Sequence, residues 1–498
     1  MNQQLLAARV EKLTALLDVG KAMASERNLD RLLQLILSEV TKVMEADRSS
    51  LFLVDRERNE LWSKIAQGLQ VREIRIKIGM GISGYVAQTG NIVNIQDAYA
   101  DARFNKETDI RTGYQTRTIL CVPMRNKLNE TIGVIQVLNK VDGTFTREDE
   151  ELLLALSSQA AVAIENALLY EDIERLFEGF IKASVYAIES RDPTTSGHSE
   201  RVAILTVGLA EKVDRADSGP YASIIFSPED MRELRYASLL HDFGKVGVRE
   251  AVLVKANKLY EHQMDGVAAR FKLIKRTLEN TYLQKKLAVA LTAGPGCDQQ
   301  IKALDEELEK RFAEVDDQFK FILEANRPAV LRQGGFERIQ DIAANTFADV
   351  NGEKVSYLTT REAENLSIGK GSLNPQERLE IESHVTHSFR FLRQIPWTKD
   401  LRRIPTIAYG HHEKLTGTGY PNSLRSDDIP FQAKMMAICD IYDALTASDR
   451  PYKKALPPER ALEILGFEVK DGNLDPELVR IFAEGKVWDL SVGMRPDR

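Results

Sequence analysis

The adjacent histidines His411 and His412 constrain this chain more than any other feature, because they directly follow an apolar helical pattern. Ile404, Ile407 and Ala408 mark one face of the preceding run, and a further step of three or four residues reaches His411. A single imidazole on an apolar face is most often a hydrogen-bonded core residue. Other segments of this chain repeat the arrangement, however, and the repetition predicts a buried polar centre.

Four other segments also direct a histidine or an aspartate inward. A helix that starts at the cap Ser227 and at Pro228 carries its apolar stripe to His241, and Asp242 follows at once. The remaining three segments supply His198, His384 and Asp440. A buried carboxylate is costly without a cation beside it, so this set predicts bound metal. Imidazole combined with carboxylate favours iron, manganese or zinc over calcium or magnesium.

The same residues carry a family resemblance. His198, the pair His241-Asp242 and Asp440 resemble the H…HD…D framework of HD-superfamily metal phosphohydrolases. The added His384, the pair His411-His412 and the loop Gly419-Tyr420-Pro421 resemble the HD-GYP subfamily, which are bacterial cyclic di-GMP phosphodiesterases. The similarity covers about residues 178–260 and 368–485, and the flanks Arg191-Asp192-Pro193 and Asp443-Ala444-Leu445 agree with it.

This resemblance implies an all-α, HD-type domain that hydrolyses cyclic di-GMP to pGpG or GMP. It implies two divalent metal ions, or three in some members, with iron or manganese expected. The expected metal ligands are His198, His241, Asp242, His384, His411, His412 and Asp440. Asp242 would bridge the metals, and Lys245 would contact a phosphate oxygen. Tyr420 would shape the substrate loop, while Arg450 and Lys453 would hold the second phosphate or a guanine.

Several positions depart from the family or stay outside the predicted centre. Thr416 stands where the family motif usually has Asp, and we expect it to affect the loop rather than the metals. Thr194 and Thr195 stand where a carboxylate for a third metal would be sought, which favours two metals. Glu413 is interpreted as orienting its neighbours rather than ligating. His387 and His262 are predicted to lie outside the centre.

Two other functions stay open at this point. One is a catalytically weak, nucleotide-sensing scaffold, against which the complete set of ligands argues. The other is an HD phosphohydrolase that acts on another cyclic dinucleotide.

The first third of the chain predicts an α+β domain. An amphipathic helix over residues 5–25 and a second helix from Asn28 to about Met44 precede several strand-like runs. These runs cover residues 49–54, 61–65, 74–78, 92–95, 119–125 and 131–139. Residues 79–86 predict a glycine-rich turn into a short helix, for which a plain turn is favoured over a phosphate cradle. The order resembles a GAF sensory domain, in which helices flank an antiparallel sheet.

A motif near the end of this region supports the resemblance. Asn139-Lys140, Phe145 and Asp149-Glu150 are similar to the NKxnFxxxDE signature of GAF domains that bind cyclic nucleotides. In that family Lys140 and Asp149 would pair with each other rather than touch the ligand. Other GAF domains carry the motif without binding a cyclic nucleotide, so another small ligand, or none, stays open.

Residues 150–189 predict one long helix that joins the two halves. Its seam of sevens, threes and fours is typical of a parallel coiled coil between two subunits, and we therefore favour a homodimer. The seam consists of Val162, Leu169, Ile173, Leu176, Phe180, Ala183 and Ala187. The alternative is a helix packed only on its own domain.

About a hundred residues interrupt the HD-type region at 261–367, where the family has a short passage. Helical spacing on both sides of Gly294-Pro295-Gly296 predicts an antiparallel helical hairpin. The hairpin would act as a lid, a partner-docking arm or a dimer element.

Composition limits the remaining possibilities. The net charge of -7 does not predict a nucleic-acid-binding surface. Three widely spaced cysteines fit a reduced, cytoplasmic protein. No signal peptide is expected at the first residues, and no apolar run is expected to span a membrane. The predicted organisation is a GAF domain over 1–168, a linker helix over 150–189 and an HD-GYP domain over 178–498 that carries the insert.

Overall fold

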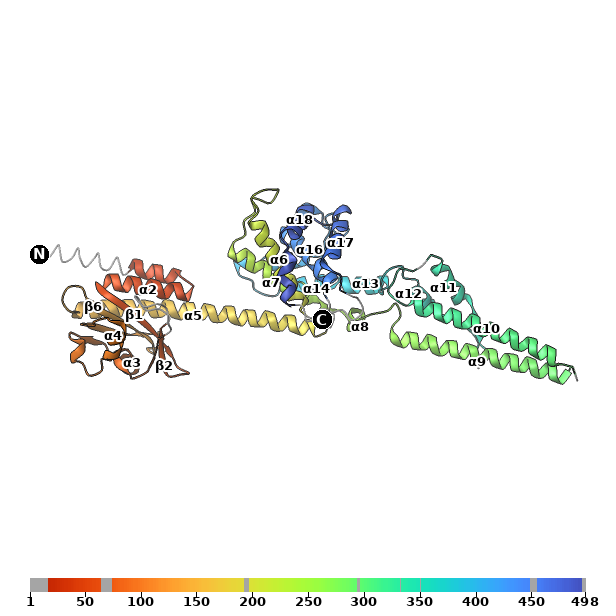
Figure 1. Cartoon of the computed structure of the whole chain (residues 1–498), viewed down its shortest axis with the longest axis horizontal. Coiled ribbons are helices and arrows are strands. Elements are labelled where there is room, and N and C mark those ends of the chain that lie inside the picture. Colours follow the sequence, from red (N-terminus) through yellow and green to blue (C-terminus); the bar gives the residue numbers. More distant parts are fainter. Residues whose placement is uncertain are drawn as a thin grey trace. The chain divides into compact units, whose positions relative to one another are not determined.

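The computed structural model describes residues 17–63, 74–191, 197–292, 296–331, 333–349, 351–447 and 455–494 (Figure 1). The chain divides into two compact units, Met1–Gly179 and Phe180–Arg498. The boundary falls inside the helix α5 (Arg147–Glu189).

A six-stranded antiparallel sheet forms the centre of the first unit, with the strand order β3-β2-β1-β6-β5-β4. Its strands are β1 (Ala46–Asp55), β2 (Glu60–Ser63), β3 (Ile74–Lys77), β4 (Val93–Ile95), β5 (Ile119–Arg125) and β6 (Thr131–Lys140). The six strand-like runs in the sequence correspond to these six strands. The antiparallel sheet predicted for this region is therefore confirmed.

Alternation along β5 separates two apolar cores, one on each face of the sheet. Leu120 and Val122 lie in one core with residues of α2 (Leu29–Val43) and α5, whereas Ile119 and Cys121 lie in the other. Helix α3 (Gly81–Thr89) packs on this second face, and η1 (Ala98–Ala100) and α4 (Lys106–Thr112) follow β4. Successive side chains of a strand point to opposite faces of the sheet, so β5 contributes alternate residues to the two cores.

Helix α2 begins where the sequence places its cap. The side chain of Asn28 accepts a hydrogen bond from the Arg31 amide at the start of α2. Residues 17–25 are helical, and the predicted N-terminal apolar residues Leu6, Val10 and Leu13 lie outside the described residues.

Helix α5 corrects one expectation from the sequence. It contains an 18-residue window with a mean hydropathy of 1.6, so its length and composition pass a test for a membrane span. Within the structure, 44% of that window is buried. Leu153, Leu156, Ala160 and Ile164 pack in the core of the first unit, which explains why an interior helix is so apolar.

The second unit is predominantly helical, as predicted. Its elements are α6 (His198–Asp214), α7 (Pro228–Leu240), η3 (Phe243–Gly247), α8 (Glu250–Leu253), α13 (Pro375–Glu382), α14 (His384–Leu392), η4 (Lys399–Leu401), α15 (Ile404–Tyr409), η5 (Ser426–Asp428), α16 (Phe431–Thr446), α17 (Pro458–Lys470), α18 (Pro476–Glu484) and η6 (Val487–Met494). Reciprocal capping by Ser227 and Asp230 fixes the start of α7, and Asn374 with Glu377 fixes that of α13.

The insert forms a helical hairpin with its own apolar core. Helices α9 (Glu261–Thr292) and α10 (Asp298–Ala325) run side by side, as Figure 1 shows. Helices α11 (Gly335–Ala344) and α12 (Thr360–Leu366) complete the insert, together with a small sheet of β7 (Thr346–Ala348) and β8 (Lys354–Ser356). The sequence predicted only helices here and missed this sheet, because three-residue strands carry almost no periodicity.

The two ends of the insert meet at its base. The Lys258 amide donates to the Asn326 carbonyl at 2.9 Å, and Lys258 Nζ donates to the Leu366 carbonyl at 3.1 Å. Farther out, Ser372 Oγ donates to the Lys255 carbonyl at 2.9 Å. The insert therefore leaves and re-enters the HD-type region at neighbouring backbone positions.

Candidate metal centre

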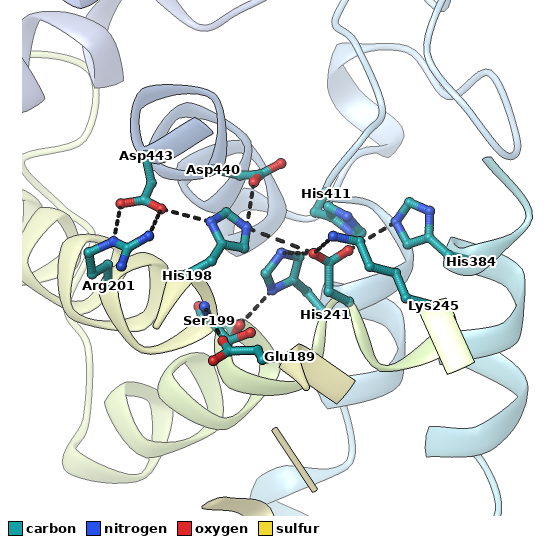
Figure 2. Close-up of polar contacts among 12 residues, drawn as sticks. Glu189, His198, Ser199, Arg201, His241, Lys245, His384, His411, Asp440 and Asp443 are labelled. Carbon is teal, nitrogen blue, oxygen red and sulfur yellow. Dashed lines mark hydrogen bonds and ion pairs between the residues drawn. The ribbon is translucent and has the colours of Figure 1, made fainter. Parts of the chain in front are cut away.

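Five of the seven histidines and two aspartates meet in the second unit, although they come from five separate segments. Figure 2 shows His198, His241, His384 and His411 gathered in one region. Three overlapping groups have ligand atoms within 4.8 Å of one another: His384 with His411 and His412, His198 with His241 and Asp242, and His241 with His411 and Asp440. All seven residues that the sequence selected as ligands belong to at least one group.

Three of the imidazoles are held in the same way. The Nδ1 atoms of His241, His384 and His411 each lie 2.6 Å from the carbonyl oxygen three residues earlier. A carbonyl oxygen only accepts, so each Nδ1 carries the proton and each Nε2 presents a lone pair. These three Nε2 atoms are buried and have no hydrogen-bond partner among the described residues. Such atoms fit a metal, which would supply the missing partner.

Burial favours the neutral form of three histidines of the centre, His241, His411 and His412. It lowers the pKa of His241 and holds the pKa of His411 well below its usual range, where the neighbouring His412 lowers it further. For His412, burial outweighs the opposing charge of Asp440 and brings the pKa to about 4. Neutral imidazole is the form that ligates metal, so the protein holds these side chains ready to bind.

The two carboxylates stay ionised despite their burial. Burial alone would raise the pKa of Asp242, but Lys245 and His241 hold it well below its usual range. Lys245 Nζ lies 2.8 Å from Asp242 Oδ2, and His384 Nε2 lies 3.2 Å from Asp242 Oδ1. Asp440 Oδ1 lies 3.2 Å from His198 Nε2. Each carboxylate thus lies close to several imidazoles, so that carboxylate oxygens and imidazole nitrogens could share a cation.

His198 is held differently from the other three. Its Nδ1 lies 2.7 Å from Asp443 Oδ2, and the Arg201 guanidinium donates to both oxygens of Asp443 at 2.7 and 3.0 Å. Burial lowers the pKa of His198, but hydrogen bonds with Asp440 and Asp443 raise it to about 9. Sequence reasoning used Asp443 only as a matching flank. Its position one helical turn after Asp440 in α16 was the signal that it faces the same centre.

The glycine-tyrosine-proline loop packs directly on the two histidines. The Tyr420 amide donates to the His412 carbonyl at 3.2 Å, and the two rings lie 4.8 Å apart. A Cβ on Gly419 would lie 2.6 Å from that carbonyl, so only glycine fits there. Glu413 accepts hydrogen bonds from the Asn422 and Leu424 amides at 2.8 and 2.9 Å. Glu413 therefore shapes this loop and does not hold an imidazole, which refines the role expected for it.

A second close approach fixes His384. A Cβ on Gly244 would collide with the His384 carbonyl, so η3 and α14 touch backbone to backbone. Ser388 joins the same elements, because its hydroxyl donates to the His241 carbonyl at 2.6 Å and accepts from the Gly244 amide at 2.7 Å. The ligands of two segments are thereby held in register.

The remaining predicted residues lie elsewhere. Arg450, Lys453, Thr194 and Thr195 lie outside the described residues. Thr416 hydrogen-bonds Thr418 and Asn473 in the loop beyond the histidines, consistent with a local role. His387 packs against Gly247, and His262 is exposed and stacks on Tyr260.

In the first unit, the polar residues of the motif all have partners within the unit. Lys140 Nζ lies 3.1 Å from Asp149 Oδ1, which confirms the predicted pair, and it also donates to the Met44 carbonyl. Asn139 accepts from the Arg117 amide at 2.6 Å and donates to the Gln115 carbonyl. Phe145 is buried, and Glu150 accepts from Asn94 at 2.8 Å.

Comparison with known families agrees with this division. A GAF domain model matches residues 28–164, and two HD domain models match residues 195–293 and 361–478. The chain therefore contains a GAF domain followed by HD-type domain sequence. The HD matches cover the segments that carry all seven residues of the centre.

Two curated relatives carry related names. The chain is 38% identical over 173 residues to a probable 3′,5′-cyclic phosphodiesterase, pde-5, of Caenorhabditis elegans, which is 32% of this chain and 24% of that protein. It is 36% identical over 171 residues to the dual 3′,5′-cyclic-AMP and -GMP phosphodiesterase 11 of Drosophila melanogaster, which is 31% of this chain and 12% of that protein. The chain thus spans a quarter or less of these relatives.

Solved GAF domains are also similar. One, from a phosphoenolpyruvate-protein phosphotransferase of Coxiella burnetii, is 23% identical with a TM-score of 0.30; it covers 32% of this chain and 96% of its own. Another, from the corresponding Acinetobacter protein, is 24% identical with a TM-score of 0.29; it covers 32% of this chain and 98% of its own.

The relatives correct the substrate expected from the sequence. Cyclic di-GMP was expected from the HD-GYP resemblance, whereas both relatives are named for 3′,5′-cyclic nucleotides. The resemblance rested on the metal ligands and on a loop whose contacts are with His412 and Glu413. Those contacts hold the loop against the candidate metal centre.

Proposed function

We propose that this chain is a metal-dependent phosphodiesterase that hydrolyses a 3′,5′-cyclic nucleotide monophosphate. One observation carries the proposal: three buried imidazoles, whose Nδ1 atoms are each bound to a backbone carbonyl, present Nε2 atoms without a hydrogen-bond partner among the described residues, beside two buried carboxylates. A protein interior rarely tolerates this arrangement unless a cation completes it.

The proposed ligands are His198, His241, Asp242, His384, His411, His412 and Asp440. Bound divalent metals would supply a hydroxide near neutral pH and offset the negative charge that develops on the phosphoryl group. Asp242, which lies within 3.8 Å of His198, His241 and His384, is the residue that could be shared between two metal ions. The imidazoles remain oriented by their Nδ1 hydrogen bonds throughout, so the centre requires little reorganisation.

Lys245 is the chain's own cation in this proposal. Its Nζ lies 2.8 Å from Asp242, and its side chain is about 15% exposed. Lys245 would donate to a non-bridging phosphate oxygen of the substrate if a bound metal took its place at Asp242. Tyr420, which packs on His412, would border the substrate. Arg450 and Lys453 remain proposed contacts for the nucleotide.

The substrate class rests on the relatives named for cyclic AMP and cyclic GMP. The GAF domain supports a regulated enzyme that binds a small ligand there, with a cyclic nucleotide as the first ligand to test. The Gly419-Tyr420-Pro421 loop supports placing the domain in the HD-GYP subfamily, although cyclic di-GMP is not the substrate proposed here. Iron or manganese as the metal, a homodimer and a cytoplasmic location complete the proposal.

The test combines metal analysis with hydrolysis of cyclic AMP and cyclic GMP, on one sample purified without oxygen. We expect about two metal ions per chain and conversion to the 5′-monophosphate, seen by chromatography. His411→Ala should lower the metal content. It should also lower the rate of hydrolysis by at least about 1,000-fold.

A matched histidine provides the control. His262→Ala removes an exposed imidazole outside the centre and should change neither quantity. Bound metal with no turnover of either nucleotide, or turnover of a cyclic dinucleotide instead, would overturn the proposed substrate. A protein without metal would overturn the proposed centre.

A further inference from the structure

Glu189, the last residue of α5, lies beside the first turn of α6, which begins at His198 (Figure 2). Its Oε2 accepts a hydrogen bond from the Gly197 amide at 2.7 Å, and its Oε1 accepts one from the Ser199 amide at 3.1 Å. These two amides belong to the residues on either side of His198. One carboxylate therefore holds the backbone on both sides of a proposed metal ligand.

The start of α6 takes its acceptor from outside the helix. The amides in the first turn of a helix have no partner within the helix, and a side chain at the N-cap commonly accepts from them. The N-cap of α6 is Gly197, which has no side chain and a φ of 67°. Glu189 accepts from this turn instead, and its negative charge is favourable at the positive end of the helix dipole.

His198 is thus held at two places. Asp443 fixes the ring, because its Oδ2 lies 2.7 Å from His198 Nδ1, whereas Glu189 fixes the backbone that carries the ring. The Nε2 atom at the other side of the ring lies 3.2 Å from Asp440 Oδ1, inside the candidate metal centre. A functional site tolerates displacements of about 0.5 Å. Loss of the backbone contact should therefore reach Nε2.

The end of α5 gives Glu189 a fixed base. Ile181, Val185 and Ile188 follow one another at steps of four and three on one face of this helix, and all three are buried. Shortly after the helix, the Arg191 guanidinium donates to the Val246 carbonyl at 2.7 Å, in the turn η3 that follows Asp242. The end of α5 therefore contacts two of the segments that form the candidate metal centre.

We infer that Glu189 is a positioning residue for His198, which acts through the backbone of α6 and not by contact with metal or substrate. This inference rests on the metal centre of the proposed function, but it does not depend on which nucleotide is hydrolysed. A carboxylate that only stabilised α6 would contribute to folding without affecting metal affinity. The two roles can therefore be separated by a variant that removes an equivalent contact elsewhere.

Asp475 provides this matched control. It accepts hydrogen bonds from the Glu477 and Leu478 amides, both at 3.0 Å, at the start of α18. It also accepts from the Tyr221 hydroxyl, so its removal should cost at least as much stability as the removal of Glu189. Asp475→Ala thus deletes a carboxylate that caps a helix of the same unit outside the candidate metal centre.

The experiment compares Glu189→Ala, Glu189→Gln and Asp475→Ala in the full chain. Hydrogen exchange of the metal-free protein should be about fivefold or more faster at residues 198–201 in Glu189→Ala, and unchanged there in Asp475→Ala. Competition with a chelator should show metal affinity about 10-fold or more lower in Glu189→Ala and unchanged in Asp475→Ala. Glu189→Gln, which keeps one acceptor oxygen, should show a smaller loss.

Two results would overturn the inference. One is unchanged exchange at residues 198–201 when Glu189 is replaced, and the other is an equal loss of metal affinity in the Glu189 and Asp475 variants. If Glu189→Ala does not fold, Glu189→Gln supports the same comparison with the wild type. A wild type that binds metal but hydrolyses neither cyclic AMP nor cyclic GMP would instead count against the proposed substrate alone.

Discussion

The polar residues of the GAF motif and those of the metal centre are similar in type but opposite in how they are satisfied. Lys140, Asp149 and Asn139 find their partners within their own unit. In the metal centre, the Nε2 atoms of His241, His384 and His411 find none among the described residues. A polar cluster that closes on itself stabilises a fold, whereas one that stays open is prepared for a ligand.

The largest effect on activity should come from a substitution of Asp242 in the candidate metal centre. Asp242→Ala removes the carboxylate whose oxygens lie 2.8 Å from Lys245 Nζ and 3.2 Å from His384 Nε2. We expect hydrolysis to fall by at least about 1,000-fold and metal content to drop. Turnover and metal analysis measure this, and full activity would contradict the assignment. Asp427→Ala, which removes an exposed aspartate in η5, is the matched control.

A smaller effect should follow from changing what holds one ligand. Asp443→Asn keeps the shape of the group that hydrogen-bonds His198 but removes the charge that Arg201 balances. We expect metal affinity to fall about 10- to 100-fold, because carboxylates behind a ligating histidine contribute that much. Titration with a competing chelator measures it. An unchanged affinity would show that Asp443 serves only the packing of α6 and α16.

A substitution in the GAF motif cluster of Lys140, Asp149 and Asn139 should change the stability of the first unit and leave metal binding unchanged. Lys140→Met leaves Asp149 with its hydrogen bonds from Thr146 but without its cation. We expect the GAF unit to lose about 1.5–3 kcal/mol of unfolding free energy, the size of a hydrogen bond to a charged group. Denaturant unfolding measures the loss, with metal content as the internal control. A fall in metal content would contradict the contrast between the clusters.

The smallest effect concerns pH. Although burial opposes it, hydrogen bonds from Thr146 and Lys140 lower the pKa of Asp149 in the folded protein. The stabilisation by Asp149 is therefore present above its unfolded pKa of about 3.9 and is lost as pH falls through the lower folded value. The stability difference between the wild type and Asp149→Asn should be constant from pH 7 to 5 and shrink below about pH 4. A difference that grows on acidification would contradict this.

The sequence predicted those parts of the molecule that local patterns determine. All six strands of the sheet and the caps of α2, α7 and α13 follow from alternation and from capping residues such as Ser227 and Asn374. The seven residues of the centre were selected because each interrupts an apolar helical stripe or belongs to a known motif. Their proximity in the structure agrees with that selection, while metal binding stays a prediction.

The remainder depends on contacts between distant segments. Asp443 and His198 are 245 positions apart, and no local pattern reports their hydrogen bond. The strands β7 and β8 are too short to show a period. Substrate choice depends on groups beyond the proposed metal ligands, so the histidine and aspartate pattern alone did not predict the substrate, and the expectation of cyclic di-GMP was wrong.

The contact between the two ends of the insert has a consequence for the evolution of this region. Lys258 hydrogen-bonds the carbonyl oxygens of Asn326 and Leu366, so the two ends of the insert are held close together. The roughly one hundred residues of the insert therefore form a closed loop on the HD-type domain. The entropy of closing a loop grows only with the logarithm of its length. Lengthening, shortening or exchanging the arm should therefore cost the surrounding domain little, and His384 would keep its place. The insertion point should therefore tolerate changes in the length and sequence of the insert while the candidate metal centre keeps its structure.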